Sequence, residues 1–84
     1  MFRTIKWTEH GEGRLEKWAL ERSEVESALR KEHHRRRPNK GKADWRINAS
    51  LPGRAARLTV LYDYREKVDP GVAEIVTVWT DECI

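Results

Sequence analysis

The hydrophobic pattern of this 84-residue chain changes its period once, near Pro38. Before that proline, apolar residues recur three and four positions apart, which is the spacing of one helix face. After it, Ala43, Trp45, Ile47 and Ala49 alternate with polar residues, which predicts a half-buried strand. A chain with both periods cannot be all-helical or all-β, so the sequence predicts an α+β fold.

Two further strands follow this alternating segment. The turn at Pro52-Gly53 separates it from a strand over residues 56–64, and the turn at Asp69-Pro70-Gly71 leads into a strand over residues 72–79. Three strands joined by short turns predict an antiparallel meander. The last strand is apolar on both faces, which is typical of a strand inside a sheet. Under strict alternation its faces would be Ala73, Ile75 and Trp79 against Val72, Val76 and Val78.

The first half of the chain predicts a strand and then a helix. Residues 2–7 are rich in β-branched and aromatic side chains, which favours a strand. Thr8 is suited to cap the helix that follows, whose apolar stripe is Leu15, Trp18 and Ala19. Gly11 weakens the opening turn of this helix, unless the backbone must approach another segment closely there.

A second helix is marked at both ends. Ser23 followed by Glu26 predicts a capping box, and Val25, Ala28 and Leu29 form its buried stripe. We expect this helix to fade by residues 33–34, ahead of the proline.

These elements predict one domain over residues 1–84, with no repeat or linker. The order is strand, helix, helix and three-stranded antiparallel meander, which gives a four-stranded sheet. Two apolar helix stripes need a surface to cover, so we expect both helices on one sheet face. The other face would be left as a shallow groove with a polar rim.

Positive charge is concentrated between Arg30 and Lys42. Seven basic residues and one acid, Glu32, give this segment a charge of +6, while the rest of the chain carries −3. Such a local asymmetry indicates an anionic partner. A solvated, mobile loop is the alternative interpretation.

Several classes of site are disfavoured by the sequence. Cys83 is a single cysteine, so no disulfide forms within the chain, and His33 and His34 have no further ligands at metal-binding spacing. We expect no metal and no cofactor. The chain has no apolar run of membrane-spanning length and no signal-peptide pattern at its start, so a cytoplasmic location without membrane association is expected.

The order of elements, together with a few residues, resembles a known group of small domains. His10 opens the first helix and Arg14 follows four residues later, a capped helix begins at Ser23-Glu24-Val25-Glu26, and the last strand ends in Ile75-Val76-Thr77-Val78-Trp79. This pattern is similar to small bacterial domains related to RelE-type toxins and, more distantly, to the barnase/RelE-like ribonuclease fold. The resemblance spans nearly the whole chain.

The resemblance implies a metal-independent endoribonuclease that cuts RNA, free or on the ribosome, by attack of a 2′-hydroxyl on the adjacent phosphate. It implies that His10 acts as base or acid, that Arg14 holds the phosphate and that Thr77 hydrogen-bonds it. It also implies a small acidic antitoxin as partner. Relatives often carry a further Arg near the end of the first helix, where this chain has Trp18, with Lys17 beside it.

Two alternatives remain beside the enzyme hypothesis. The chain could be an RNA- or DNA-binding module without catalysis, or a protein-interaction domain whose basic segment meets an acidic partner. For nucleic acid, Tyr62, Tyr64 and Trp79 offer stacking surfaces if they face the open groove. The residues expected to contact a phosphate backbone are Arg35, Arg36, Arg37, Lys40, Lys42 and Arg46.

Overall fold

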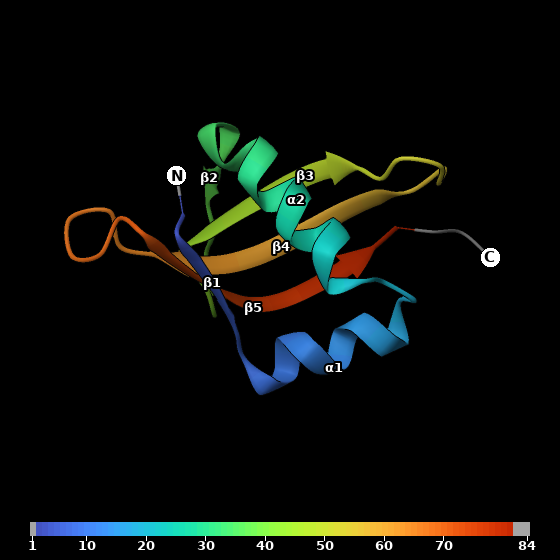
Figure 1. The fold of residues 1–84 in the computed structure, drawn as a ribbon, viewed down its shortest axis with the longest axis horizontal. Helices are drawn as coiled ribbons and strands as arrows, with labels where there is room; N and C mark the ends of the chain where they lie inside the picture. Colours follow the sequence, from blue (N-terminus) through green and yellow to red (C-terminus); the bar gives the residue numbers. More distant parts are fainter. Residues whose placement is uncertain (1, 82–84) are drawn as a thin grey trace.

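The computed structural model describes residues 2–81; Met1 and residues 82–84, including Cys83, lie outside the described residues. Two α-helices and one five-stranded sheet make an α+β fold, with the strands in the order β1-β5-β4-β3-β2 (Figure 1). Along the chain the elements are β1 (Thr4–Trp7), α1 (Glu9–Lys17), α2 (Arg22–Glu32), a 3₁₀ turn (His33–Arg35), β2 (Arg37–Pro38), β3 (Trp45–Ser50), β4 (Arg57–Tyr64) and β5 (Val72–Thr80).

The sheet is mixed and has one strand more than expected. β3, β4 and β5 pair antiparallel in chain order, while β1 pairs parallel with β5. The extra strand is the two-residue β2, which pairs with the start of β3. Proline is tolerated in β2 because this strand lies at the sheet edge. The prediction of four strands was therefore wrong, because a two-residue strand leaves no periodic pattern in the sequence.

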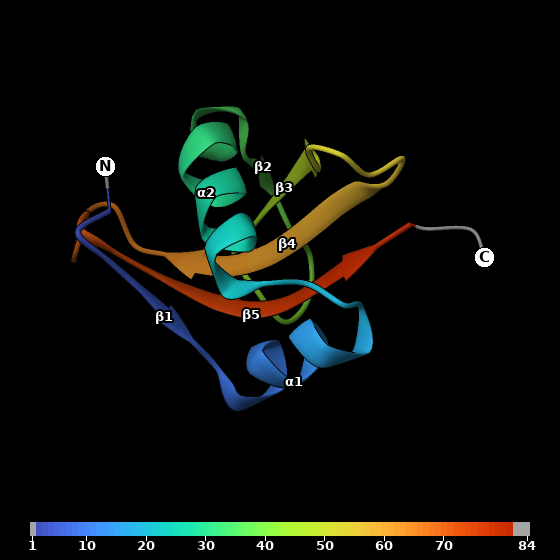
Figure 2. The same ribbon diagram turned by 45° about the vertical axis from the view of Figure 1, so that its right-hand side comes forward.

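The sequence predicts both helices on one face of the sheet, but in the structure they lie in different places. α2 packs on β3 and β4, whereas α1 packs mainly against β5 and lies along the sheet edge (Figures 1 and 2). The main core therefore lies between α2 and the sheet. Its fully buried side chains are Val25, Leu29, Leu58, Val60, Tyr62, Ala73, Ile75 and Val78.

α1 lies at the edge because its first turn is bonded to β5 where β1 ends. The Thr8 N–H donates to the Ile75 carbonyl, and the Thr8 hydroxyl lies 3.0 Å from the Val76 carbonyl while accepting from the Gly11 N–H. A Cβ at Gly11 would come within 2.9 Å of the Ile75 carbonyl oxygen. Gly11 therefore permits the close approach that the sequence left open.

α1 ends at Lys17, two residues before the last residue of its predicted apolar stripe. Ala19 is exposed and has a positive φ of 53°, so it does not continue the buried stripe. The N–H of Leu20 bonds the Leu15 carbonyl and that of Ala19 bonds the Glu16 carbonyl, which is a Schellman ending. The guanidinium of Arg54 donates to the Ala19 carbonyl and stabilises this turn.

α2 begins two residues before the predicted capping box. Glu21 is the N-cap residue, and its backbone N–H donates to the Glu24 carboxylate at 2.9 Å. Glu26, which the sequence placed in the box, accepts a 2.9 Å bond from the Trp7 indole instead. Val25, Ala28 and Leu29 are buried as predicted.

A β-bulge in β5 changes which side chains face each side of the sheet. Tyr62 of β4 pairs with Ile75, but the residue before it, Leu61, pairs with Thr77. Val76 is therefore an extra residue in β5. Beyond it the alternation is reversed: Val78 is buried under α2, while Trp79 is 37% exposed on the opposite face. The predicted grouping of Trp79 with Ile75 was therefore wrong.

Candidate functional site

A pocket of about 430 Å³ lies where α1 meets the far half of β5. Three separate segments form it: α1, the bulged part of β5, and the loop between β2 and β3, which passes on the side of the sheet away from α2 (Figure 2). Its lining residues are His10, Arg14, Trp18, Lys42, Val76, Thr77, Val78 and Trp79.

α1 supplies an imidazole and a guanidinium to this pocket. His10 and Arg14 are one helical turn apart, so both side chains point to the same side of the helix. The Arg14 Nε donates to His10 Nε2 at 3.3 Å. An imidazole nitrogen can accept a proton, so the residue type at this place suits a general base.

β5 supplies a hydroxyl and an indole because of the bulge. Without the extra residue Val76, Thr77 and Trp79 would point toward α2, and the bulge instead turns both toward the pocket. Trp79 is paired across the sheet with Thr59, whose hydroxyl accepts a 2.8 Å bond from the Asn48 amide. An exposed indole therefore lies beside polar groups on this face.

The loop between β2 and β3 supplies a cation. Lys42 lines the pocket opposite α1, and the buried Ala43 anchors the loop next to it. Lys17, the basic residue beside Trp18, does not line the pocket; its ammonium lies 5.6 Å from the Trp18 ring centre. The second cation of the pocket thus comes from the loop.

The pocket is suited to an anion. Among residues 2–81, its lining includes Arg14, Lys42 and His10 but no Asp or Glu. Two cations without a neighbouring carboxylate attract a negatively charged ligand, and a hydroxyl and an imidazole are available to bond it. Among the residues that the structure describes, no three His, Cys, Asp or Glu side chains form a group able to hold a metal ion.

The remaining basic residues are spread over several surfaces. Arg46 is exposed on the pocket's face of the sheet, in line with Leu61 and Thr77. Arg37 and Lys40 are exposed near β2, and Arg35 lies in a second groove beside α2. Of the predicted phosphate contacts, Lys42 therefore lines the pocket and Arg46 shares its sheet face.

Two arginines of the basic segment contact other parts of the protein. Arg30 donates to the Phe2 carbonyl. The Arg36 guanidinium lies 4.6 Å from the Trp45 ring centre, in cation–π geometry, and 3.4 Å from the Glu66 carboxylate. These contacts attach the segment to the sheet.

His33 belongs to an aromatic cluster in the core. Its Nδ1 is 2.7 Å from the Tyr62 hydroxyl, and its ring packs edge-on against Phe2 and Tyr64. Burial, helped by the nearby Arg36 charge, lowers the pKa of His33 to about 4, and burial raises the pKa of Tyr62. The neighbouring His34 is exposed, so the two adjacent histidines have different surroundings.

Sequence reasoning named His10, Arg14 and Thr77 but did not connect Lys42 or Trp79 to them. The spacing of four residues places His10 and Arg14 on one helix face, whereas the bulge places Trp79 and the path of the β2–β3 loop places Lys42.

Within residues 2–81 no helix combines the length and apolar character needed to cross a membrane. Comparisons with protein-family models, with curated proteins and with solved structures give no match to this chain.

Proposed function

We propose that this chain is a metal-independent endoribonuclease of the RelE-like toxin type. The observation that carries the proposal is that His10, Arg14 and Thr77, named from a resemblance in sequence, line one pocket together with Lys42. His10 and Arg14 are far from Thr77 in the sequence, so only the fold brings these three side chains into one pocket. A toxin-type enzyme would be held silent by a small acidic partner protein, which the cationic pocket is suited to attract.

The proposed reaction is an internal transesterification of RNA. His10 Nε2 removes the proton of a 2′-hydroxyl, the O2′–P bond forms and the P–O5′ bond breaks. Arg14 and Thr77 bind the non-bridging phosphate oxygens, where negative charge increases in the transition state. The Lys42 ammonium supplies the proton to the leaving 5′-oxygen. The products are a 2′,3′-cyclic phosphate and a 5′-hydroxyl.

Binding of the phosphate also changes the pocket. In the free protein the Arg14 Nε–H donates to His10. When a phosphate binds, this N–H would donate to a phosphate oxygen instead. That exchange would release His10 Nε2 to accept the substrate proton while keeping Arg14 paired.

The test is cleavage of a labelled single-stranded RNA by the purified protein in the presence of a metal chelator. We expect fragments with 2′,3′-cyclic phosphate ends, no cleavage of the same sequence as DNA, and a loss of at least about 100-fold in rate for His10→Ala. His34→Ala is the matched control, since this exposed histidine lies outside the pocket, and it should cleave like the wild type. Intact RNA, or equal cleavage by His10→Ala, would contradict the proposal.

A nucleic-acid-binding module without catalysis is the second candidate. Trp18 lines the pocket where the resembling domains often have an arginine, and Trp79 offers an exposed stacking surface beside the cations. In that case the RNA would bind with a strong salt dependence but stay intact, and His10→Ala would leave both properties unchanged.

A further inference from the structure

The outer edge of β3 is unpaired over half of its length. β2 pairs with β3 at Trp45 and Arg46, and no described strand pairs with that edge beyond this point. On the inner side, the Leu51 N–H donates to the Ala56 carbonyl, and pairing residues alternate along an antiparallel ladder. The N–H and C=O groups of Asn48 and Ser50 therefore point outward, free to bond another strand.

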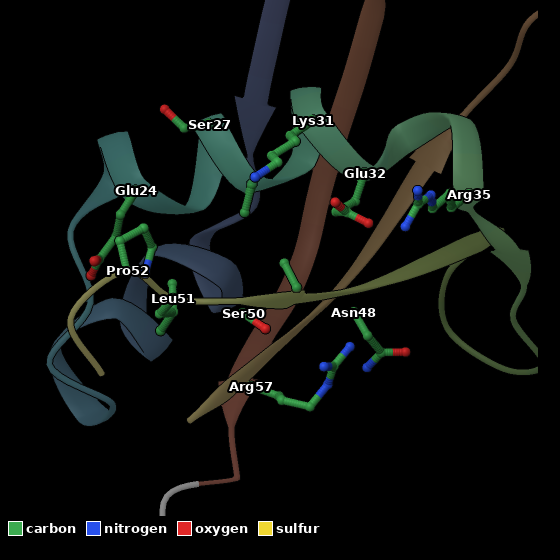
Figure 3. Close-up of a pocket in the computed structure, with 12 residues that line it drawn as sticks. Glu24, Ser27, Lys31, Glu32, Arg35, Asn48, Ser50, Leu51, Pro52 and Arg57 are labelled. Carbon is green, nitrogen blue, oxygen red and sulfur yellow. The ribbon is translucent and has the colours of Figure 1, made fainter. Parts of the chain in front are cut away.

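This edge opens into a groove of about 510 Å³ between β3 and α2 (Figure 3). Figure 3 shows Glu24, Lys31, Glu32 and Arg35 in turn along α2 and its following turn, with Leu51, Ser50 and Asn48 below them in the same direction. The wall beside the strand includes the small residues Ala28 and Ala49. The groove contains no histidine.

The edge also lacks the features by which proteins usually prevent strand addition. Those features are prolines, lysines and bulges within the edge strand. The segment Ile47–Ser50 contains none of these residues, and its register with β4 is regular. Pro52 limits pairing at one end and β2 at the other, so the open stretch is short.

We propose that a second copy of this chain pairs with the edge of β3 beside β2, giving a two-fold symmetric dimer in which the two β3 strands join the sheets of both copies. In antiparallel pairing centred on Ala49, Asn48 of one copy faces Ser50 of the other. Each such pair exchanges its two outward backbone bonds, and the symmetry repeats the exchange. The two Ala49 side chains meet on the α2 side, where their size permits close approach.

The charges along the groove favour a second copy over an unrelated strand. A two-fold rotation reverses the order of groups along the groove, so the Glu24 end of one copy faces the Arg35 end of the other. At that end Glu24 also lies 3.8 Å from the Arg54 guanidinium of its own copy. Near the axis, Lys31 of one copy faces Glu32 of the other. Neither Lys31 nor Arg35 has an ion pair within residues 2–81, so both cations are available for this interface. The groove is therefore complementary to itself.

The dimer would leave the candidate catalytic pocket accessible. That pocket lies between α1, β5 and the loop that carries Lys42, which passes on the side of the sheet away from α2. The proposed interface is instead formed by α2 and the Asn48–Ser50 edge of β3. Dimerisation is thus independent of the proposed RNA chemistry.

The test is analytical ultracentrifugation of the purified protein between about 10 and about 500 µM, the range in which a dimer with a micromolar dissociation constant forms. We expect a concentration-dependent dimer. Ser50→Pro removes an outward N–H without removing a bond to β4, and should give a monomer at all these concentrations. Ser50→Thr keeps the N–H and should dimerise like the wild type.

A third variant tests the charges. Arg35→Glu places two carboxylates together across the interface and should weaken the dimer by at least about tenfold in dissociation constant. Circular dichroism melting checks that each variant is folded. A wild-type protein that stays monomeric up to the highest concentration, or a folded Ser50→Pro variant that still dimerises, would overturn the proposal.

Discussion

At the scale of single residues, His33 and His10 show how one residue type takes two roles. His33 is half-buried against Phe2 and Tyr64 and bonded to the Tyr62 hydroxyl, whereas His10 is exposed in a cationic pocket. Nothing in the sequence near either histidine distinguishes them, because the neighbours that matter are far away along the chain. The sequence singles out His10 through a resemblance in which this residue opens the first helix four residues before Arg14.

His33 makes stability depend on pH. Its pKa is about 4 in the folded protein and 6.5 in the unfolded chain, so between these values the unfolded state binds an extra proton. Its contribution is complete above pH 6.5 and is lost as the pH falls toward 4. Between pH 7.5 and 4.5 we expect the unfolding free energy to fall by roughly 1–2 kcal/mol through this residue, allowing for solvent around its half-buried ring.

Urea unfolding at several pH values measures this effect. His33→Asn should flatten the dependence in the window from pH 6.5 to 4, and the exposed His34→Asn serves as the matched control that should keep it. An unchanged slope in His33→Asn would show that other groups cause the loss of stability.

At the scale of elements, the junction of β1, α1 and β5 determines the candidate site. β1 ends where the Thr8 N–H bonds Ile75, α1 starts there, and the bulge at Val76 follows directly on β5. α1 could therefore be predicted from Thr8 and the apolar stripe, but its place at the sheet edge could not. The same holds for Thr77 and Trp79, since strict alternation puts them on the α2 face and a single extra residue reverses this.

The two glycines of α1 test the close approach to β5. Gly11→Ala would bring a Cβ to 2.9 Å from the Ile75 carbonyl, so we expect a loss of about 2 kcal/mol in unfolding free energy despite the better helix propensity of alanine. Gly13 has no atom within 4 Å of such a Cβ. Gly13→Ala should therefore stabilise the protein by about 0.5–1 kcal/mol. Thermal or urea unfolding measures both, and a stabilising Gly11→Ala would contradict the packing described.

At the scale of the whole molecule, the sheet separates the two proposed sites. The β5 edge, covered by α1, holds the acid-free pocket, and the β3 edge, beside α2, holds the groove proposed for dimerisation. The helical and strand segments follow from the hydrophobic periods, and so does the α+β class. The parallel pairing of β1 with β5 and the path of the loop that carries Lys42 depend on long-range contacts that no local pattern encodes.

The basic residues between Arg30 and Lys42 do not act as one unit in the folded protein. They do not form one continuous surface, because Arg30 and Arg36 bind groups of the protein itself while Arg35 and Lys42 lie in different pockets. The concentration of positive charge in this segment indicated an anionic partner. Of its residues, only Lys42 lines the pocket proposed to bind that partner, and Arg46 lies on the same sheet face.

The central claim is that RNA binds in the pocket of His10, Arg14, Lys42 and Thr77. The most direct test is an NMR titration of the ¹⁵N-labelled protein with a short 2′-O-methyl RNA, which binds but cannot be cut. If RNA binds there, the largest shifts will occur at the amides of these four residues and at the Trp79 indole. Shifts centred on α2 and the β3 edge, or no shifts at millimolar RNA, would contradict it.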